Sequence, residues 1–138
     1  MKHLGRKSVL TAAQIARPRT ILDTFANSHP DRDYEIKLVF PEFTSVCPVT
    51  GQPDFATIIV TYTPAKKCVE MKSLKLYYLA FRNKAAFFEA VINGILDDLV
   101  WAVSPRAMTV RGEFAVRGGM SAVVEARHDY IDVDTTPF

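Results

Sequence analysis

The sequence predicts an α+β domain in which an antiparallel four-stranded sheet carries two helices on one face. Two segments with strand periodicity precede two with helical periodicity, and two more strand-like segments follow. Strands and helices grouped in this way are typical of α+β domains with the helices on one side of the sheet. At 138 residues, with 49% hydrophobic and 23% charged residues, the chain has the size and composition of one globular domain.

Two strand-like segments flank a stretch that contains proline and glycine. Apolar side chains occupy every second position in residues 34–40, which predicts a half-buried strand, and we expect this strand to end at Pro41. Residues 56–62 are rich in β-branched side chains, which favour strands, and Pro64 closes this segment. These segments are expected to form the first two strands of the sheet.

The two central segments have helical periodicity. Apolar residues at helical spacing predict a short helix that begins at Ser73 and ends near Asn83. From Phe87 to Val103 large apolar side chains recur every four residues and also fill the adjacent row. This longer helix is therefore expected to pack a wide apolar face on the sheet. A serine followed by Pro105 ends it.

A β-hairpin completes the predicted sheet. Residues 107–114 alternate between apolar and polar side chains, and residues 120–126 follow after a turn with two adjacent glycines. The resulting order of elements is ββααββ. In the N-terminal segment, Pro18 is expected to interrupt any helix that begins at Ala12. We divide the chain into an N-terminal arm (1–30), a single folded domain (31–130) and a C-terminal tail (131–138).

Composition excludes several classes of protein. The formal net charge of +2 is too small to indicate direct binding to nucleic acid or to a membrane, although a small basic excess suits a phosphate-bearing ligand. No apolar run approaches the roughly 18 residues of a membrane span, and no signal peptide is evident, so we expect a cytoplasmic protein. Cys47 and Cys68 are too few for a disulfide framework, and the three histidines are far apart, so no metal site is expected.

The segment SVCPVTGQPDF, from Ser45 to Phe55, contains the main candidates for catalysis. Two prolines and a glycine restrict its backbone, which predicts an ordered loop. A nucleophilic thiolate at Cys47 needs a proton acceptor or a positive potential nearby, and an acid must protonate the group that the sulfur attacks. Asp54 suits either need. The same pattern is also typical of a small buried cysteine and a turn-forming aspartate without catalytic roles.

Four segments in order resemble a known enzyme family. They are SVCPVTGQPDFA from Ser45, VEMKSLKLYYLAFRN from Val69, FEA around Glu89 and RGGMS from Arg117. Together they resemble 7-cyano-7-deazaguanine reductase, the NADPH-dependent nitrile reductase of queuosine biosynthesis, in its short single-module form. The resemblance covers roughly residues 31–121. It implies the tunnelling fold, shared with GTP cyclohydrolase I, which agrees with the ββααββ order.

The resemblance implies a chemistry for the two candidates. Cys47 would attack the nitrile carbon of 7-cyano-7-deazaguanine to form a covalent thioimide, with Asp54 as the proton donor. Hydrides from two NADPH molecules would then reduce the nitrile to a primary amine. These residue types suit the reaction, because a nitrile accepts hydride poorly until a nucleophile is added to its carbon and a proton to its nitrogen.

The resemblance also implies binding residues. Glu89 matches the family's substrate glutamate, and a carboxylate can accept two hydrogen bonds from a guanine-like base. Further substrate contacts are implied for Glu70, Met71, Lys72 and Phe88. Cations suited to the cofactor's phosphates are Lys72, Lys75 and Arg117. Without the resemblance, Glu89 would be read as a helix-surface residue and the basic residues as a solvated face.

Two departures from the family's pattern affect substrate contact. Met71 stands where many members have serine or leucine, and Phe88 where many have histidine; stacking of Phe88 on the base is one way to replace the histidine. A thioimide-forming transferase of the same superfamily and a noncatalytic deazapurine-binding protein remain alternatives. A small sheet has edges to protect, and the resemblance implies that several subunits join their sheets into a barrel. We therefore also expect a ring oligomer of two stacked pentamers, with active sites between subunits.

Overall fold

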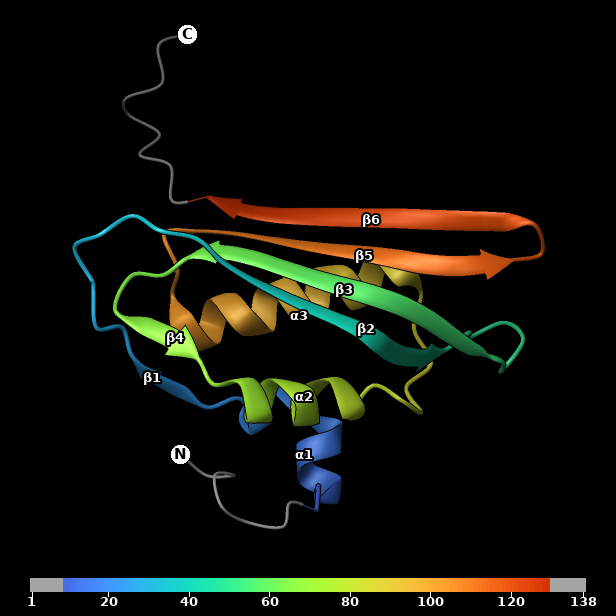
Figure 1. Cartoon of the computed structure of the whole chain (residues 1–138). Helices are drawn as coiled ribbons and strands as arrows, with labels where there is room; N and C mark the ends of the chain where they lie inside the picture. Colours follow the sequence, from blue (N-terminus) through green and yellow to red (C-terminus); the bar gives the residue numbers. More distant parts are fainter. Residues whose placement is uncertain (1–8, 130–138) are drawn as a thin grey trace, which may run out of the picture.

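The computed structural model describes residues 9–129. Four long strands form one antiparallel sheet in the order β2 (Ile36–Val46), β3 (Pro53–Thr63), β5 (Ala107–Arg117) and β6 (Met120–Asp129). The helices α2 (Met71–Leu79) and α3 (Phe88–Val103) cover one face of this sheet (Figure 1). The α+β fold class, with both main helices on one face, is therefore confirmed.

The core lies between this face of the sheet and the two helices. The helix α2 packs on β2, and α3 packs on β5 and β6. Ile58 and Val60 of β3 are fully buried, as are Ile92 and Ile95 of α3. At Gly112 of β5 an added Cβ would lie 2.5 Å from Cδ1 of Ile92, so the absence of a side chain there permits the close approach of α3.

The first two strands are longer than the sequence predicted. The prediction that the first strand ends at Pro41 is wrong, because β2 continues to Val46 through an irregularity of register between Phe40 and Phe43. Proline is tolerated at such a position on an edge strand, where it removes no necessary ladder hydrogen bond. The strand β3 likewise begins at Pro53, which shortens the expected loop to residues 47–52.

Capping explains the observed helix boundaries. The helix α2 begins at Met71, two residues before the predicted start, because the Glu70 carboxylate accepts hydrogen bonds from the backbone N–H groups of Lys72 and Ser73. The predicted end of this helix near Asn83 is too late, since α2 ends at Leu79. The helix α3 agrees with its prediction and ends at Ser104 in the left-handed conformation, φ 44°.

Further elements precede and connect the sheet strands. They are α1 (Ala12–Ala16), the 3₁₀ helix η1 (Pro18–Ile21), β1 (Thr24–Ala26) and β4 (Lys67–Val69). The helix α1 ends before Pro18, as expected, and η1 buries Ile21 in the core. The strands β1 and β4 pair in a small sheet that the sequence did not reveal. The assigned tail (131–138) lies outside the described residues. Within residues 9–129 no helix is long and apolar enough to cross a membrane.

Candidate active site

Cys47 lies at the start of the connection between β2 and β3, and its side chain is half-buried. The backbone N–H of Cys47 donates to the carbonyl of Gln52 at 2.8 Å, and that of Gly51 donates to the carbonyl of Cys47 at 2.9 Å. Gly51 adopts φ 72°, a conformation that glycine reaches without strain. The thiol is therefore held on a closed, hydrogen-bonded turn.

The surroundings of Cys47 favour its thiolate. Hydrogen bonding from the Thr50 hydroxyl is the largest cause of a lowered Cys47 pKa, and the backbone N–H groups of Thr50 and Val49 act in the same direction. Burial and the charge of Asp54 oppose this shift, but the net direction is downward. A lowered pKa increases the thiolate fraction at neutral pH, as a nucleophilic cysteine requires.

Asp54 is the second residue of β3 and pairs in register with Ser45 of β2. Only 6% of its surface is exposed. An Arg117 guanidinium nitrogen, Nη1, lies 3.2 Å from Oδ1 of Asp54, and Nη2 of the same side chain donates to the carbonyl of Pro53. The structure thus places the predicted acid beside the predicted thiol turn, as a buried carboxylate in an ion pair.

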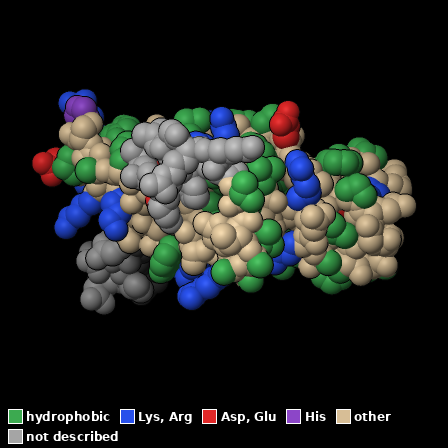
Figure 2. Space-filling model, turned by 90° about the horizontal axis from the view of Figure 1, so that it is seen from below, with side chains coloured by type: hydrophobic (Ala, Val, Ile, Leu, Met, Phe, Trp, Pro, Cys, Tyr) green, Lys and Arg blue, Asp and Glu red, His purple; other side chains and the backbone are tan. Residues whose placement is uncertain are grey.

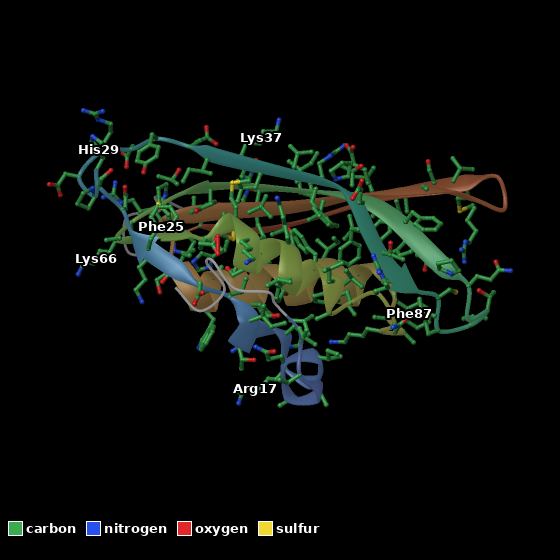
Figure 3. The ribbon with its side chains drawn as sticks, turned by 60° about the horizontal axis from the view of Figure 1, so that its bottom comes forward. Arg17, Phe25, His29, Lys37, Lys66 and Phe87 are labelled. Carbon is green, nitrogen blue, oxygen red and sulfur yellow. The ribbon has the colours of Figure 1, made fainter. Side chains whose placement is uncertain are left out.

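The N-terminus of α3 reaches the same end of the sheet. In the connection between α2 and α3, the carbonyl of Lys84 accepts from the N–H of Val46 at 3.0 Å, and the N–H of Ala86 donates to the carbonyl of Val46 at 3.1 Å. Figure 3 shows Phe87, which precedes α3, near the end of β2. The half-buried Phe88 and the exposed Glu89 therefore begin α3 close to the chain segment that contains Cys47.

A second group of predicted residues surrounds the start of α2. Glu70 and Met71 line a pocket of about 440 Å³, within the size range of small-molecule sites. A neighbouring pocket of about 140 Å³ lies between α2 and the edge strand β2 and is lined by Lys75 and Lys37, among others. Lys72 is half-buried on the first turn of α2.

The two groups lie far apart in one chain. The residues beside Met71 include Leu38, which pairs with Val60 of β3. Val60 is six positions from Asp54 along the same strand, a separation of about 20 Å at the usual rise per residue. Figure 3 shows Phe25, which lines the larger pocket, and Phe87 at opposite ends of the molecule. The structure therefore separates Arg117 from the lysines with which the sequence had grouped it.

Two further side chains near the predicted residues, Ser45 and Lys37, were not predicted from the sequence. Ser45 is fully buried, and its hydroxyl has no hydrogen-bond partner among residues 9–129. The alternation that buries Phe43 also places Ser45 on the inner face, so a longer first strand would have indicated it. Lys37 of the edge strand points away from α2 in Figure 3, and it contributes to the lining of the pocket between β2 and α2, which the sequence alone did not reveal.

A half-buried thiol near a buried carboxylate at one end of the sheet, with pockets of small-molecule size elsewhere on the chain, is an arrangement typical of enzymes that act on small molecules. Comparison with known proteins gives the family: a family model described as "QueF-like protein" matches residues 53–132. The chain belongs to this family.

Several relatives share one enzyme name. A protein of Anaeromyxobacter sp. (strain Fw109-5), named NADPH-dependent 7-cyano-7-deazaguanine reductase, is 60% identical over 112 residues, or 81% of this chain and 92% of its own. A protein of Chlorobium luteolum with the same name is 59% identical over 109 residues, 79% of this chain and 94% of its own. Both alignments span nearly the whole length of the relatives.

A solved structure supports the fold. The crystal structure of the archaeosine synthase QueF-Like in the apo form superposes with a TM-score of 0.63 and covers 72% of this chain and 95% of its own. At 20% identity it shows the fold alone. Within residues 9–129 there is no group of three or more histidine, cysteine, aspartate or glutamate side chains that could hold a metal ion.

Proposed function

We propose that this chain is an NADPH-dependent nitrile reductase, which converts 7-cyano-7-deazaguanine to its 7-aminomethyl product in queuosine biosynthesis. The observation that carries the proposal is the pairing of Cys47 and Asp54 at one end of the sheet, in a chain 60% identical to a protein with that activity in its name. The substrate is the free base, and the reaction belongs in the cytoplasm, where thiols stay reduced.

Cys47 begins the reaction as the nucleophile. Its sulfur attacks the nitrile carbon, and one carbon–nitrogen π bond opens as the carbon–sulfur bond forms. The proton that leaves the thiol ends on the nitrile nitrogen, so the thioimide forms without net loss or gain of protons. Hydrogen bonds from Thr50 and the turn backbone favour the thiolate that this step uses.

Asp54 moves the proton. Its carboxyl group lies beside the turn that bears Cys47 and is excluded from most solvent. A buried acid there can carry the thiol's proton to the nitrogen, and general acid–base catalysis of this kind contributes about 10²–10⁴-fold to the rate. Glu89, exposed at the start of α3 near the same end of the sheet, is proposed to hold the base through paired hydrogen bonds.

The residues at α2 fit the phosphates of NADPH. Lys75 and Lys37 line one pocket, and Lys72 lies one turn before Lys75 on the same helix. Several lysine and arginine side chains also lie on the face of the molecule that Figure 2 shows, where few acidic side chains are visible. Ammonium groups suit a phosphate-bearing ligand. Two molecules of NADPH, bound in turn, would each supply one of the two hydrides that the four-electron reduction requires.

Assembly would unite the two groups of residues. The strands β2 and β6 form the edges of the sheet, with 11 and 10 residues respectively, and long open edges invite pairing with another chain. If β2 of one subunit lies beside β6 of the next, the thiol turn of one chain can meet the α2 pocket of another. We propose a ring oligomer of two stacked pentamers with the active sites, including Glu70 and Met71, between subunits.

Incubation with 7-cyano-7-deazaguanine tests the proposed function. Without NADPH, intact-mass measurement is expected to show one substrate added to each wild-type chain and none to Cys47→Ala. With NADPH, absorbance at the reduced-nicotinamide band is expected to fall by two equivalents per amine formed. An adduct without NADPH oxidation would favour a thioimide-forming transferase. Binding of the base with no adduct at any pH would favour a noncatalytic binding protein.

A further inference from the structure

We propose that Ser45 is a positioning residue for Asp54, and that its buried hydroxyl orients the carboxyl group of the proposed acid. This inference rests on the proposed function and deepens it, because it assigns a residue to the orientation of the acid. The starting observation is a buried polar atom without a partner. Ser45 is 0% exposed, and its hydroxyl has no hydrogen-bond partner among residues 9–129.

The hydroxyl of Ser45 is unfavourable for stability where it lies. Burial of a hydroxyl without a hydrogen bond costs free energy, and most buried polar groups in folded proteins are therefore paired. The neighbourhood is largely apolar, since Phe43, two positions earlier on β2, is buried against the rings of Tyr78 and Phe81. An alanine would fill nearly the same volume without that cost. Packing alone therefore does not explain a serine at this position.

The strand register places Asp54 directly opposite Ser45. The two residues form one cross-strand pair of β2 and β3, so their side chains project to the same face of the sheet. That face is the one that the helices cover, because the pair two positions further on, Phe43 and Ala56, is buried in the core. Cβ atoms of directly opposite residues lie about 4.5–5.5 Å apart, a distance that a hydroxyl and a carboxylate can bridge with one hydrogen bond.

The carboxylate of Asp54 can accept this hydrogen bond. An ionised carboxylate has about four lone-pair sites, and the ion pair in the structure joins its Oδ1 to Nη1 of Arg117 at 3.2 Å. This contact leaves acceptor capacity for Ser45. Arg117 is also a predicted ligand of the cofactor's phosphates, and the two roles are compatible. When the guanidinium turns to a phosphate, the hydroxyl of Ser45 remains beside the buried carboxylate as a donor.

Ser45 also lies close to the proposed nucleophile along the chain. Cys47 follows it by two positions, and the bond from the N–H of Cys47 to the carbonyl of Gln52 continues the pairing of β2 and β3 into the turn. The connection to α3 is fixed to the residue between them, where the N–H of Ala86 donates to the carbonyl of Val46 at 3.1 Å. A donor held at this point limits rotation of the carboxyl group and keeps one of its oxygens directed toward a substrate attached to the thiol.

Ser45→Ala tests the role through two measurements that a structural serine would not separate. Thioimide formation at Cys47, followed by intact mass without NADPH, is expected to slow by about 10-fold to 10²-fold at saturating base, the effect of one hydrogen bond to a charged group. The concentration of base that gives half this rate is expected to change by less than about twofold, because the loss lies in the chemical step. The urea midpoint is expected to stay the same or rise, since an unpaired buried hydroxyl is removed.

Two further variants serve as controls. Ser45→Thr keeps the hydroxyl but adds a methyl group to a fully buried site, so it is expected to have a lower urea midpoint and a faster adduct rate than Ser45→Ala. Ser73→Ala is the matched control for stability. Ser73 is also 0% exposed, but its hydroxyl donates to the carbonyl of Glu70 at 2.8 Å and accepts from the N–H of Asp23 at 2.9 Å. Loss of this paired hydroxyl is expected to lower the urea midpoint.

A double-mutant cycle gives a second readout. In the Asp54→Asn background, Ser45→Ala is expected to cause no further loss of adduct rate, because a residue that acts through the acid has nothing left to position. The same pair of substitutions is expected to leave the urea midpoint of Ser45→Ala without a large additional change, so that the cycle reports on chemistry and not on unfolding.

Three results would overturn the inference. The first is a wild-type adduct rate in Ser45→Ala. The second is an adduct rate in Ser45→Thr, measured on folded protein, as slow as that of Ser45→Ala, which would mean that the hydroxyl is not the group that matters. The third is full additivity of the two substitutions in the cycle. If the wild-type protein itself formed no adduct and oxidised no NADPH, the proposed function would fail instead, and the two failures are distinguishable.

Discussion

Phe88 lies flat against Phe114, with ring centroids 3.8 Å apart and an angle of 15° between the ring planes. Phe88 is the first residue of α3 and Phe114 is a buried residue of β5, so this stack joins the start of the helix to the sheet. One face of the Phe88 ring is therefore occupied within its own chain. The residue where the family's pattern has histidine serves here to fix the helix that carries Glu89.

Phe88→Ala is expected to lower the free energy of unfolding by about 1–3 kcal/mol, because it removes a half-buried ring and its stacking contact. Phe88→His retains a planar ring and is expected to lose less. Urea unfolding followed by circular dichroism measures both. Equal losses in the two variants would mean that the aromatic stack contributes nothing beyond apolar burial.

The fold was largely predictable from periodicity. Residues 87–103 have an uninterrupted helical pattern, and the hairpin of β5 and β6 alternates clearly, so their positions were predicted within a few residues. The end of the first strand was predicted wrongly at Pro41. A proline at an irregular position of an edge strand gives the same sequence pattern as a proline that ends a strand. The strands β1 and β4 are three residues each, too short for any pattern.

The candidate site residues could be chosen from the sequence, but their positions relative to one another could be predicted only in part. The spacing of Cys47 and Asp54 within one hairpin made their proximity foreseeable. The partner of Asp54 was not, because Arg117 follows it by 63 positions and only the β3–β5 pairing brings the two strands together. The resemblance grouped Arg117 with Lys72 and Lys75, and within one chain the topology places Arg117 at the opposite end of the sheet from the two lysines.

Gly112→Ala is expected to destabilise the protein by about 1–3 kcal/mol, as overpacking of a core does. Its Cβ would meet Cδ1 of Ile92 at 2.5 Å and the ring of Phe114 at 2.9 Å, so the Ile92 side chain must move or α3 must shift. The shift would also disturb Glu89 on the same helix, and thermal unfolding and turnover should therefore fall together. Ile92→Val in the same chain relieves the contact and should recover part of the stability, whereas additive losses would contradict this explanation.

Thr50→Val is expected to raise the pKa of Cys47. The Thr50 hydroxyl is the largest cause that lowers this pKa, and valine keeps the shape but cannot donate. The rate of iodoacetamide alkylation follows the thiolate, so its pH midpoint should lie below the ordinary value of about 8.5 in wild type and move upward in the variant. Cys47→Ala corrects for reaction at Cys68. An unchanged midpoint would mean that the backbone N–H groups alone lower the pKa.

Cys47→Ala is expected to abolish turnover and leave binding of the base intact, because the pocket loses one small side chain. Asp54→Asn is expected to keep the fold and to lose about 10²–10⁴-fold in rate, since an amide cannot carry the proton. Steady-state kinetics and calorimetric titration with 7-cyano-7-deazaguanine measure the two effects. Near-normal turnover of Asp54→Asn would remove Asp54 from the mechanism.

Light scattering on the purified protein tests assembly. A ring of two stacked pentamers requires ten chains per particle, with β2 of one subunit against β6 of the next. A substitution that blocks an edge, such as Val39→Pro in β2, is expected to reduce the particle mass and the activity together, because the proposed active site draws residues from two chains. A fully active monomer would refute the shared site.

The last prediction concerns cofactor binding. A reductase must bind NADPH, whereas a thioimide-forming transferase does not need to. Lys72→Ala combined with Lys75→Ala removes two cations from α2 and is expected to raise the KM for NADPH while adduct formation at Cys47 stays normal. The wild-type KM should increase with ionic strength, since ion pairs at a surface are screened over about 10 Å at 0.1 M salt, and this sensitivity should shrink in the double variant.

Lys66→Ala is the matched control for this experiment. Lys66 is exposed before β4, outside the residues that line the α2 pockets, and its removal should leave the KM for NADPH unchanged. The 2′-phosphate adds charge that lysines recognise, so the double variant should lose much of its preference for NADPH over NADH. If adduct formation failed instead while the KM for NADPH held, Lys72 and Lys75 would belong to the substrate pocket.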